Sequence, residues 1–241
     1  MTAPHPTRIE ALTFDLDDTF WDNQPVMART EAGHYDWLHE RVGHAERFPL
    51  EEYQRRRLEF AARHPVRRGD FTWVRRETLR EMLLEFGLDT DEAARWADAT
   101  IEHMLELRHD ITVFEEVPEM LDALAGRYRL AAITNGNVDL TRLAIGEHFP
   151  VIINAGESLA PKPDARAFLA ALARLGPVPP SRALHVGDSW REDVLPALRL
   201  GMRVAWIDKD DARPATLPDG VHRLAHIRDL PALLGHLETK G

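Results

Sequence analysis

The sequence predicts an α/β fold in which a doubly wound parallel sheet, the Rossmann-like core, is interrupted by an all-helical domain. Three observations support this fold class. Residues 9–14 form a short apolar segment that ends at Asp15. The segment from Phe20 to Asp110 carries helix signals and no convincing strand, and beyond it apolar segments alternate with helical ones. Alternating strands and helices are typical of a parallel sheet covered by helices on both faces.

The core strands are expected where short apolar segments precede turn residues. The first is residues 9–14, which acidic turn residues follow. The later strands are expected at residues 129–133, 151–153, 183–186 and 203–207. Helices are expected from Pro118 to Gly126, at residues 164–174 and 192–200, and after Asp229. Because parallel strands place their carboxyl ends on one edge of the sheet, ligand chemistry is expected at that edge.

The inserted segment carries the start and stop signals of successive helices. Pro25 suits the first turn of a helix, where its missing N–H is not needed. Asp70 precedes an apolar repeat that ends at Gly87, and Asp89 with Glu92 has the spacing of a capping box. A further helical repeat is formed by Leu50, Tyr53, Leu58 and Ala61.

The length of the chain predicts two domains of unequal size. Its 241 residues exceed one typical domain, as a core with a smaller insertion requires. We expect residues 1–20 and 111–241 to form the core and residues 21–110 to form the helical domain. The sequence makes no prediction of the oligomeric state.

Composition excludes several classes of function. A formal net charge of -10 argues against nucleic acid as a partner, because binding a phosphate backbone requires an extended cationic surface. The absence of cysteine excludes disulfides, thiolate metal sites and cysteine nucleophiles. The first ten residues lack the features of a signal peptide, and no apolar segment approaches the ~20 residues that cross a bilayer. We therefore expect a cytoplasmic protein without a membrane partner.

Polar side chains follow four of the predicted strands. They are Asp15 with Asp17, Thr134 with Asn135, Lys162, and Asp188 with Asp193. Since the carboxyl ends of parallel strands converge, we expect these groups to lie together. Several carboxylates in one place repel each other and need a hard cation, for which Mg²⁺ is the usual match.

This set of groups fits phosphoryl transfer, which depends on positioning and on neutralising the charge of phosphoryl oxygens. Lys162 supplies a positive charge, and Thr134 and Asn135 can donate hydrogen bonds to those oxygens. An aspartate such as Asp15 can accept the phosphoryl group covalently. Asp17, two residues further along an extended segment, points the same way and can transfer protons.

The same residues resemble the four motifs of the haloacid dehalogenase-like superfamily. In chain order they are Asp15-Leu16-Asp17-Asp18-Thr19, Thr134, Lys162-Pro163, and Gly187-Asp188-Ser189 with Asp193. The resemblance implies that Asp15 is the nucleophile and Asp17 the general acid and base, while Thr134 and Lys162 hold the phosphoryl group. It also implies Mg²⁺ bound by Asp15, the backbone carbonyl of Asp17 and Asp188, with Asp193 acting from outside the coordination sphere. The helical insertion is similar to the cap that closes over small phosphate esters in part of that superfamily.

Longer segments support a narrower resemblance. They are residues 12–19, 22–26, 29–31, 133–137 and 184–188. These segments resemble the bacterial FMN phosphatase and 5-amino-6-(5-phospho-D-ribitylamino)uracil phosphatase family of flavin biosynthesis, whose relatives include nucleotidases and sugar phosphatases. The resemblance implies a phosphoric monoester hydrolase that acts on a small phosphorylated metabolite.

Three alternatives remain open on the sequence alone. A phosphosugar mutase would use the same residues. A 2-haloacid dehalogenase of the same fold attacks carbon and needs neither a leaving-group acid nor Mg²⁺, so Asp17 and Asp188 argue against it. A phosphoacceptor signalling module, like a response-regulator receiver, also combines acidic residues, threonine and lysine, but the helical insertion of about ninety residues argues against it.

Residues of the inserted domain are candidates for gripping the leaving group, although each taken singly is better explained by packing or solvation. The candidates are Trp21, Asp22, Arg29, Asp70, Trp73, Arg75 and Arg76. If the domain acts as a cap, it must open and close, and we expect hinges near residues 20–23 and 110–113.

Overall fold

The computed structural model describes residues 8–154, 160–209 and 216–239. These residues form two compact units. The first contains the sheet and comprises the described residues up to Asp22, Thr112–Gly136 and those from Leu140 onward. The second is helical and comprises Asn23–Ile111 with Asn137–Asp139. The ends of the expected core domain, 1–7 and 240–241, lie outside the described residues.

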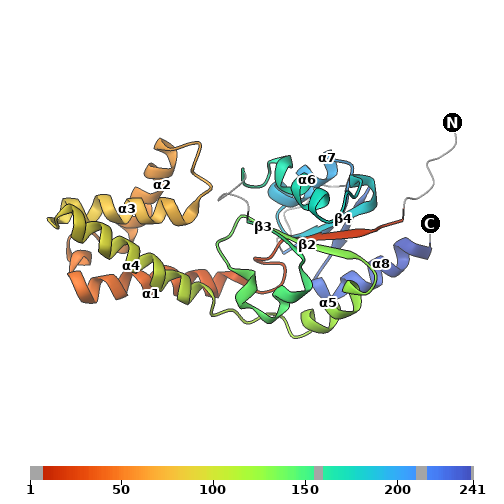
Figure 1. The fold of residues 1–241 in the computed structure, drawn as a ribbon, viewed down its shortest axis with the longest axis horizontal. Coiled ribbons are helices and arrows are strands. Elements are labelled where there is room, and N and C mark those ends of the chain that lie inside the picture. Colours follow the sequence, from red (N-terminus) through yellow and green to blue (C-terminus); the bar gives the residue numbers. More distant parts are fainter. Residues whose placement is uncertain (1–7, 155–159, 210–215, 240–241) are drawn as a thin grey trace. The chain divides into compact units, whose positions relative to one another are not determined.

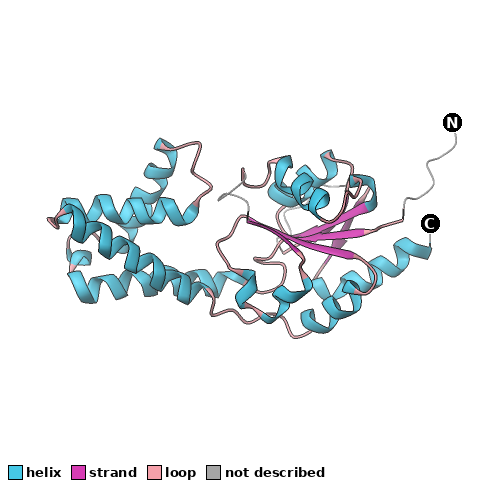
Figure 2. Cartoon of the chain, viewed as in Figure 1, coloured by secondary structure: helices cyan, strands magenta, loops and turns pink. Residues whose placement is uncertain are grey.

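Six parallel strands form one sheet in the order β3-β2-β1-β4-β5-β6 (Figure 2). The strands are β1 (Ala11–Phe14), β2 (Arg129–Thr134), β3 (Val151–Asn154), β4 (Ala183–Gly187), β5 (Arg203–Ile207) and β6 (Val221–Leu224). The strand order reverses between β1 and β4. In open α/β sheets the crevice at such a point, beyond the carboxyl ends of the strands, is the usual ligand site.

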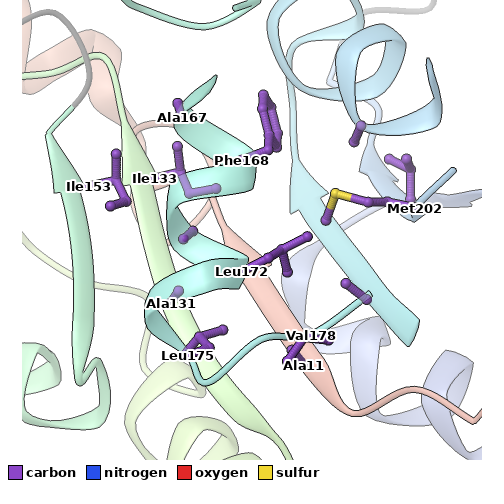
Figure 3. Close-up of a cluster of buried hydrophobic side chains, with 14 of the residues drawn as sticks. Ala11, Ala131, Ile133, Ile153, Ala167, Phe168, Leu172, Leu175, Val178 and Met202 are labelled. Carbon is purple, nitrogen blue, oxygen red and sulfur yellow. The ribbon is translucent and has the colours of Figure 1, made fainter. Parts of the chain in front are cut away.

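Helices cover both faces of this sheet (Figure 1). α5 (Val117–Ala125) and α8 (Leu230–Thr239) lie on one face, and α6 (Ala165–Arg174) and α7 (Leu195–Arg199) lie on the other. Figure 3 shows Phe168 and Leu172 of α6 within one buried cluster that also contains Ala131 and Ile133 of β2. Burying a side chain the size of leucine or phenylalanine contributes about 1.5–3 kcal/mol, so this layer holds the strand ends in place.

The second unit is a separate helical bundle. Its helices are α1 (Asn23–Val42), α2 (Leu50–Arg63), α3 (Phe71–Phe86) and α4 (Thr90–Arg108). Asp70 and Asp89 cap the starts of α3 and α4, accepting hydrogen bonds from the N–H groups of Trp73 and Glu92. Gly87 ends α3 in the left-handed conformation, with φ of 115°. A core of its own, which includes Tyr35, Leu38, Tyr53, Leu79, Met82 and Ile101, holds the bundle together.

The predicted parallel sheet with flanking helices is confirmed, and two details differ. The sheet has a further edge strand, β6, in which only Val221 and Leu224 are buried. The helix expected at residues 192–200 is instead a π-helical turn, η5 (Trp190–Val194), followed by the short α7. The N–H of Val194 reaches back to the carbonyl of Ser189 at 3.2 Å, which produces the wider turn.

Candidate active site

Asp15 directly follows β1 at the point where the strand order reverses. Its N–H extends the pairing of β1 with β4 by bonding the carbonyl of Val186 at 2.9 Å. This bond anchors the backbone, and the side chain is buried, with 7% of the residue exposed. Asp18 has a left-handed φ of 62° in the turn that follows, and its carboxylate accepts a hydrogen bond from Lys209 at 2.7 Å. This geometry gives Asp18 a structural role in the turn.

The carboxylate of Asp17 lies in a different environment from that of Asp15. It accepts a hydrogen bond from the indole N–H of Trp21 at 3.0 Å. Trp21 is fully buried in the sheet-containing unit, so this contact fixes the orientation of the Asp17 side chain. The structure thus shows one function for Trp21, as a donor to Asp17.

Lys162 brings two buried carboxylates together. Its ammonium group donates to Asp15 Oδ1 at 2.6 Å and to Asp193 Oδ1 at 2.7 Å, and only 4% of the residue is exposed. Burial alone would lower the pKa of Lys162, but the two carboxylates outweigh it and hold that pKa above its ordinary value. Lys162 is therefore a fixed positive charge beside Asp15.

Asp193 is fully buried and accepts hydrogen bonds from three donors. Lys162 and His185 donate to Oδ1, at 2.7 and 3.1 Å, and the N–H of Ser189 donates to Oδ2 at 3.0 Å. Burial would raise the pKa of Asp193, but Lys162 and His185 outweigh it and hold that pKa below its usual range. The carboxylate is thus ionised and its orientation is fixed. The π-helical turn η5 is the element that places it against β4.

Among the described residues, the carboxylates of Asp15, Asp188 and Asp193 are close enough to bind one metal ion, with ligand atoms within 4.8 Å of one another. Burial, and then the neighbouring carboxylates, raise the pKa of Asp188 to about 7. Burial is also the largest reason that the pKa of Asp15 lies well above its ordinary value. When all three carboxylates are ionised, the single lysine leaves an excess of two negative charges, which a divalent cation would neutralise.

Thr134, the last residue of β2, and Asn135, the residue after it, have different surroundings. Thr134 Oγ1 accepts a hydrogen bond from the N–H of Gly136 at 2.8 Å, so its own hydrogen remains for another acceptor. The side chain of Asn135 is bonded to the backbone of Lys162, donating to its carbonyl at 3.0 Å and accepting from its N–H at 2.7 Å. It also donates to Glu192 at 2.9 Å. The Asn135 side chain therefore holds the lysine segment to the end of β2.

Sequence reasoning missed His185 and Glu192, which contact the predicted site residues Asp193 and Asn135, and Thr13, which contacts His185. The available signal was a polar residue in the middle of an apolar strand, which Thr13 and His185 both provide. The bulky segment after Asp188 is accommodated by stacking, because Trp190 packs against Trp206 at 4.8 Å between ring centroids. Trp206 also donates to the carbonyl of Asp188 at 2.8 Å, which steadies that loop.

Most of the candidate leaving-group residues of the helical unit have structural partners. Asp70 caps α3, Arg29 pairs with Asp110 at 3.2 Å and Arg76 pairs with Asp98 at 2.9 Å. The guanidinium of Arg67 lies 4.0 Å from the centroid of the Trp73 ring. Arg75 is buried, and Asp22, which belongs to the sheet-containing unit, is exposed. In the described part of the chain, no helix combines the length and the apolar character that crossing a bilayer requires.

The buried lysine shared by two aspartates thus lies at the carboxyl edge of a doubly wound sheet, where open α/β sheets usually bind their ligands. The chain belongs to the haloacid dehalogenase-like hydrolase family, whose model matches residues 9–201.

Relatives and solved structures agree with this family. The 5-amino-6-(5-phospho-D-ribitylamino)uracil phosphatase YigB of Escherichia coli (strain K12) is 35% identical over 200 residues, which cover 83% of this chain and 84% of the relative. The phosphoserine phosphatase of Thermus thermophilus is 32% identical over 234 residues, covering 83% and 89%. A solved structure described as a 2-haloacid dehalogenase from Pseudomonas syringae pv. Tomato DC3000 has a TM-score of 0.87 and 35% identity, and the match covers 95% of this chain and 99% of that one.

Proposed function

We propose that the protein is a Mg²⁺-dependent phosphatase that hydrolyses small phosphate monoesters through an aspartyl phosphate on Asp15. The observation that carries this proposal is the buried ammonium of Lys162, held between Asp15 and Asp193 at 2.6 and 2.7 Å. It fixes a positive charge beside an anionic nucleophile, where the oxygens of a transferred phosphoryl group need one. The phosphatases among the relatives support the same reaction.

In the proposed reaction an oxygen of Asp15 attacks phosphorus, and the bond from phosphorus to the ester oxygen breaks. Asp17 gives its proton to the leaving alcohol. Asp17 then takes a proton from water, whose oxygen attacks phosphorus and breaks its bond to Asp15, releasing inorganic phosphate. Lys162 and the hydroxyl of Thr134 hold the phosphoryl oxygens throughout, and Asn135 contributes by fixing the backbone of Lys162.

The carboxylates of Asp15 and Asp188, with the backbone carbonyl of Asp17, are the proposed Mg²⁺ ligands. When bound, the ion would neutralise the excess negative charge and polarise the phosphoryl group. We place Asp193 outside the coordination sphere because Lys162, His185 and the N–H of Ser189 already use its two oxygens. Removing divalent metal with a chelator is expected to abolish activity, and adding Mg²⁺ is expected to restore it.

The proposed substrates are FMN, a ribityl-pyrimidine phosphate or a nucleotide. Support comes from the name of the Escherichia coli relative and from the 27% identity over 135 residues to the pyrimidine 5'-nucleotidase YjjG of the same organism. We propose that the helical unit acts as a cap that selects among them, moving about the segments near residues 20–23 and 110–113. A phosphate-release screen over FMN, ribityl phosphates, nucleotides and sugar phosphates, ranked by kcat/KM, tests the assignment. A substrate converted to an isomer without phosphate release would instead indicate the mutase.

A second candidate is 2-haloacid dehalogenase activity, which the similarity to the Pseudomonas syringae dehalogenase structure favours. A dehalogenase would displace halide from carbon without a leaving-group acid. Asp17, oriented by Trp21, and the acidic Asp188 argue for the phosphatase. Chloride release from 2-chloropropionate that persists with a chelator, together with no phosphate release from any ester of the screen, would establish the dehalogenase.

A further inference from the structure

Two polar residues face each other in β1 and β4, the two central strands of the sheet, whose other residues are apolar or glycine. Thr13 of β1 and His185 of β4 are partners in the strand register, and both are fully buried. The hydroxyl of Thr13 and Nδ1 of His185 lie 2.8 Å apart. The other side of the imidazole reaches the loop beyond β4, where Nε2 lies 3.1 Å from Asp193 Oδ1. The imidazole thus links the strand before Asp15 to the carboxylate that holds Lys162.

The partners of the imidazole determine which of its nitrogens carries hydrogen. The ionised carboxylate of Asp193 can only accept hydrogen bonds, so Nε2 of His185 must be the donor. A neutral imidazole has a single N–H, so Nδ1 is then an acceptor and the hydroxyl of Thr13 donates to it. Phe168 of α6 packs edge-on against the same ring, with centroids 4.9 Å apart. Three neighbours therefore fix the position, the rotation and the tautomer of His185.

We propose that His185, oriented by Thr13, is a positioning residue that fixes the Asp193 carboxylate and thereby keeps Lys162 shared between Asp193 and Asp15. Without its N–H, Asp193 would keep only the hydrogen bonds from Lys162 and from the N–H of Ser189, and its carboxylate would be held less firmly. Lys162 would then associate more closely with Asp15, reducing the nucleophilicity of that carboxylate and drawing the ammonium away from the phosphoryl oxygens. The kinetic part of this inference rests on the proposed phosphatase function. The hydrogen-bond direction does not.

Two amide substitutions at His185 distinguish a positioning role of its N–H from a role in core packing alone. Gln places an amide nitrogen near the place of Nε2, whereas Asn reaches only the place of Nδ1. His185→Gln is therefore expected to keep kcat/KM for p-nitrophenyl phosphate within about threefold of wild type. His185→Asn is expected to lose about 10- to 100-fold, the range for a lost hydrogen bond to a charged group. Similar losses in both variants would overturn the proposal.

A second pair of variants tests the same contact from β1. Thr13→Val keeps the shape of threonine and removes the hydroxyl, whereas Thr13→Ser keeps the hydroxyl. We expect Thr13→Val to lower kcat about 3- to 10-fold and Thr13→Ser to lower it less than twofold, with KM little changed in both. Thermal unfolding of each variant shows whether it is folded. If His185→Asn does not fold, the threonine pair decides, and equal kcat values for its two members would overturn the proposal.

Nitrogen NMR tests the hydrogen-bond direction independently of catalysis. In the long-range ¹H–¹⁵N spectrum of histidine-labelled protein at pH 7, the signals lost in His185→Gln identify His185 among the 12 histidines. We expect a neutral ring protonated at Nε2. A ring protonated at Nδ1, or at both nitrogens, would overturn the proposal. If wild type released no phosphate from any ester, the proposed function would fail, and the tautomer alone would decide this inference.

Discussion

Gly187, the last residue of β4, is the position where one added methyl group should damage the site most directly. A Cβ at this residue would lie 2.5 Å from Cγ and 2.7 Å from Oδ2 of Asp193. The first distance is about 0.9 Å short of the 3.4 Å at which ordinary contact begins. Asp193 cannot rotate away without losing hydrogen bonds, because Lys162, His185 and the N–H of Ser189 all donate to it.

Gly187→Ala must therefore displace Asp193, and with it Lys162, by nearly 1 Å. A misplacement of about 1 Å in a catalytic site reduces activity by about 100-fold, and overpacking costs about 1–3 kcal/mol of stability. Phosphate release from p-nitrophenyl phosphate measures the first effect, and urea denaturation measures the second.

The matched control is Gly235→Ala in α8, where nothing lies within 4 Å of the added Cβ. Replacing a helix-interior glycine with alanine is expected to leave activity unchanged and to raise stability by about 0.5–1 kcal/mol. If Gly187→Ala retained wild-type kcat/KM, the close approach of Asp193 to β4 would not matter for catalysis, and our account of the site would be refuted.

The charges and hydrogen bonds of the site give three further predictions. Lys162→Met leaves two buried carboxylates without their cation, so it should lower the free energy of unfolding by about 3–5 kcal/mol and abolish turnover. Unchanged stability in urea would contradict the buried pairing. In metal-free protein the raised pKa of Asp188, about 7, means that the folded state retains a proton that the unfolded chain loses near pH 4, so the contribution of Asp188 to stability is expected to fall by up to about 4 kcal/mol as pH rises from about 4 to 7. Buried histidines with lowered pKa, such as His34 and His44, act in the opposite direction, so the fall is measured as the difference between wild type and Asp188→Asn during denaturation with a chelator. Saturating Mg²⁺ should offset it at pH 7, whereas a difference that rose over this range would contradict the shift. Thr134→Val should lower kcat/KM by about 10-fold or more and Thr134→Ser by less than about threefold, and equal values would exclude a hydroxyl contact to the phosphoryl group.

Local sequence signals predicted most of the fold. The capping residues Asp70 and Asp89 and the terminating Gly87 mark helix ends through short-range backbone chemistry, which a sequence displays directly. The edge strand β6 was missed because only Val221 and Leu224 are buried, too few for a periodic pattern. The turn η5 was predicted as an ordinary helix, since apolar periodicity does not distinguish a wide turn from a regular one.

The site residues were predictable as a set, because each follows a strand and parallel strands converge. Their mutual contacts were not predictable, because side-chain directions depend on tertiary packing. Phosphate binding by Asn135 stays a prediction, and the structure adds that its side chain is bonded to the backbone of Lys162. His185 lies in a strand far from Thr13 in sequence, and only the register of β1 with β4 makes them neighbours.

The most direct test of the central claim is to look for a phosphoryl group on Asp15 itself. The protein is mixed with p-nitrophenyl phosphate and Mg²⁺, quenched in acid and mapped by mass spectrometry, in wild type, Asp17→Asn and Asp15→Asn. We expect the adduct on Asp15, in larger amount in Asp17→Asn because water is no longer activated, and neither adduct nor phosphate release in Asp15→Asn. An adduct on another residue, or turnover by Asp15→Asn at the wild-type rate, would contradict the account.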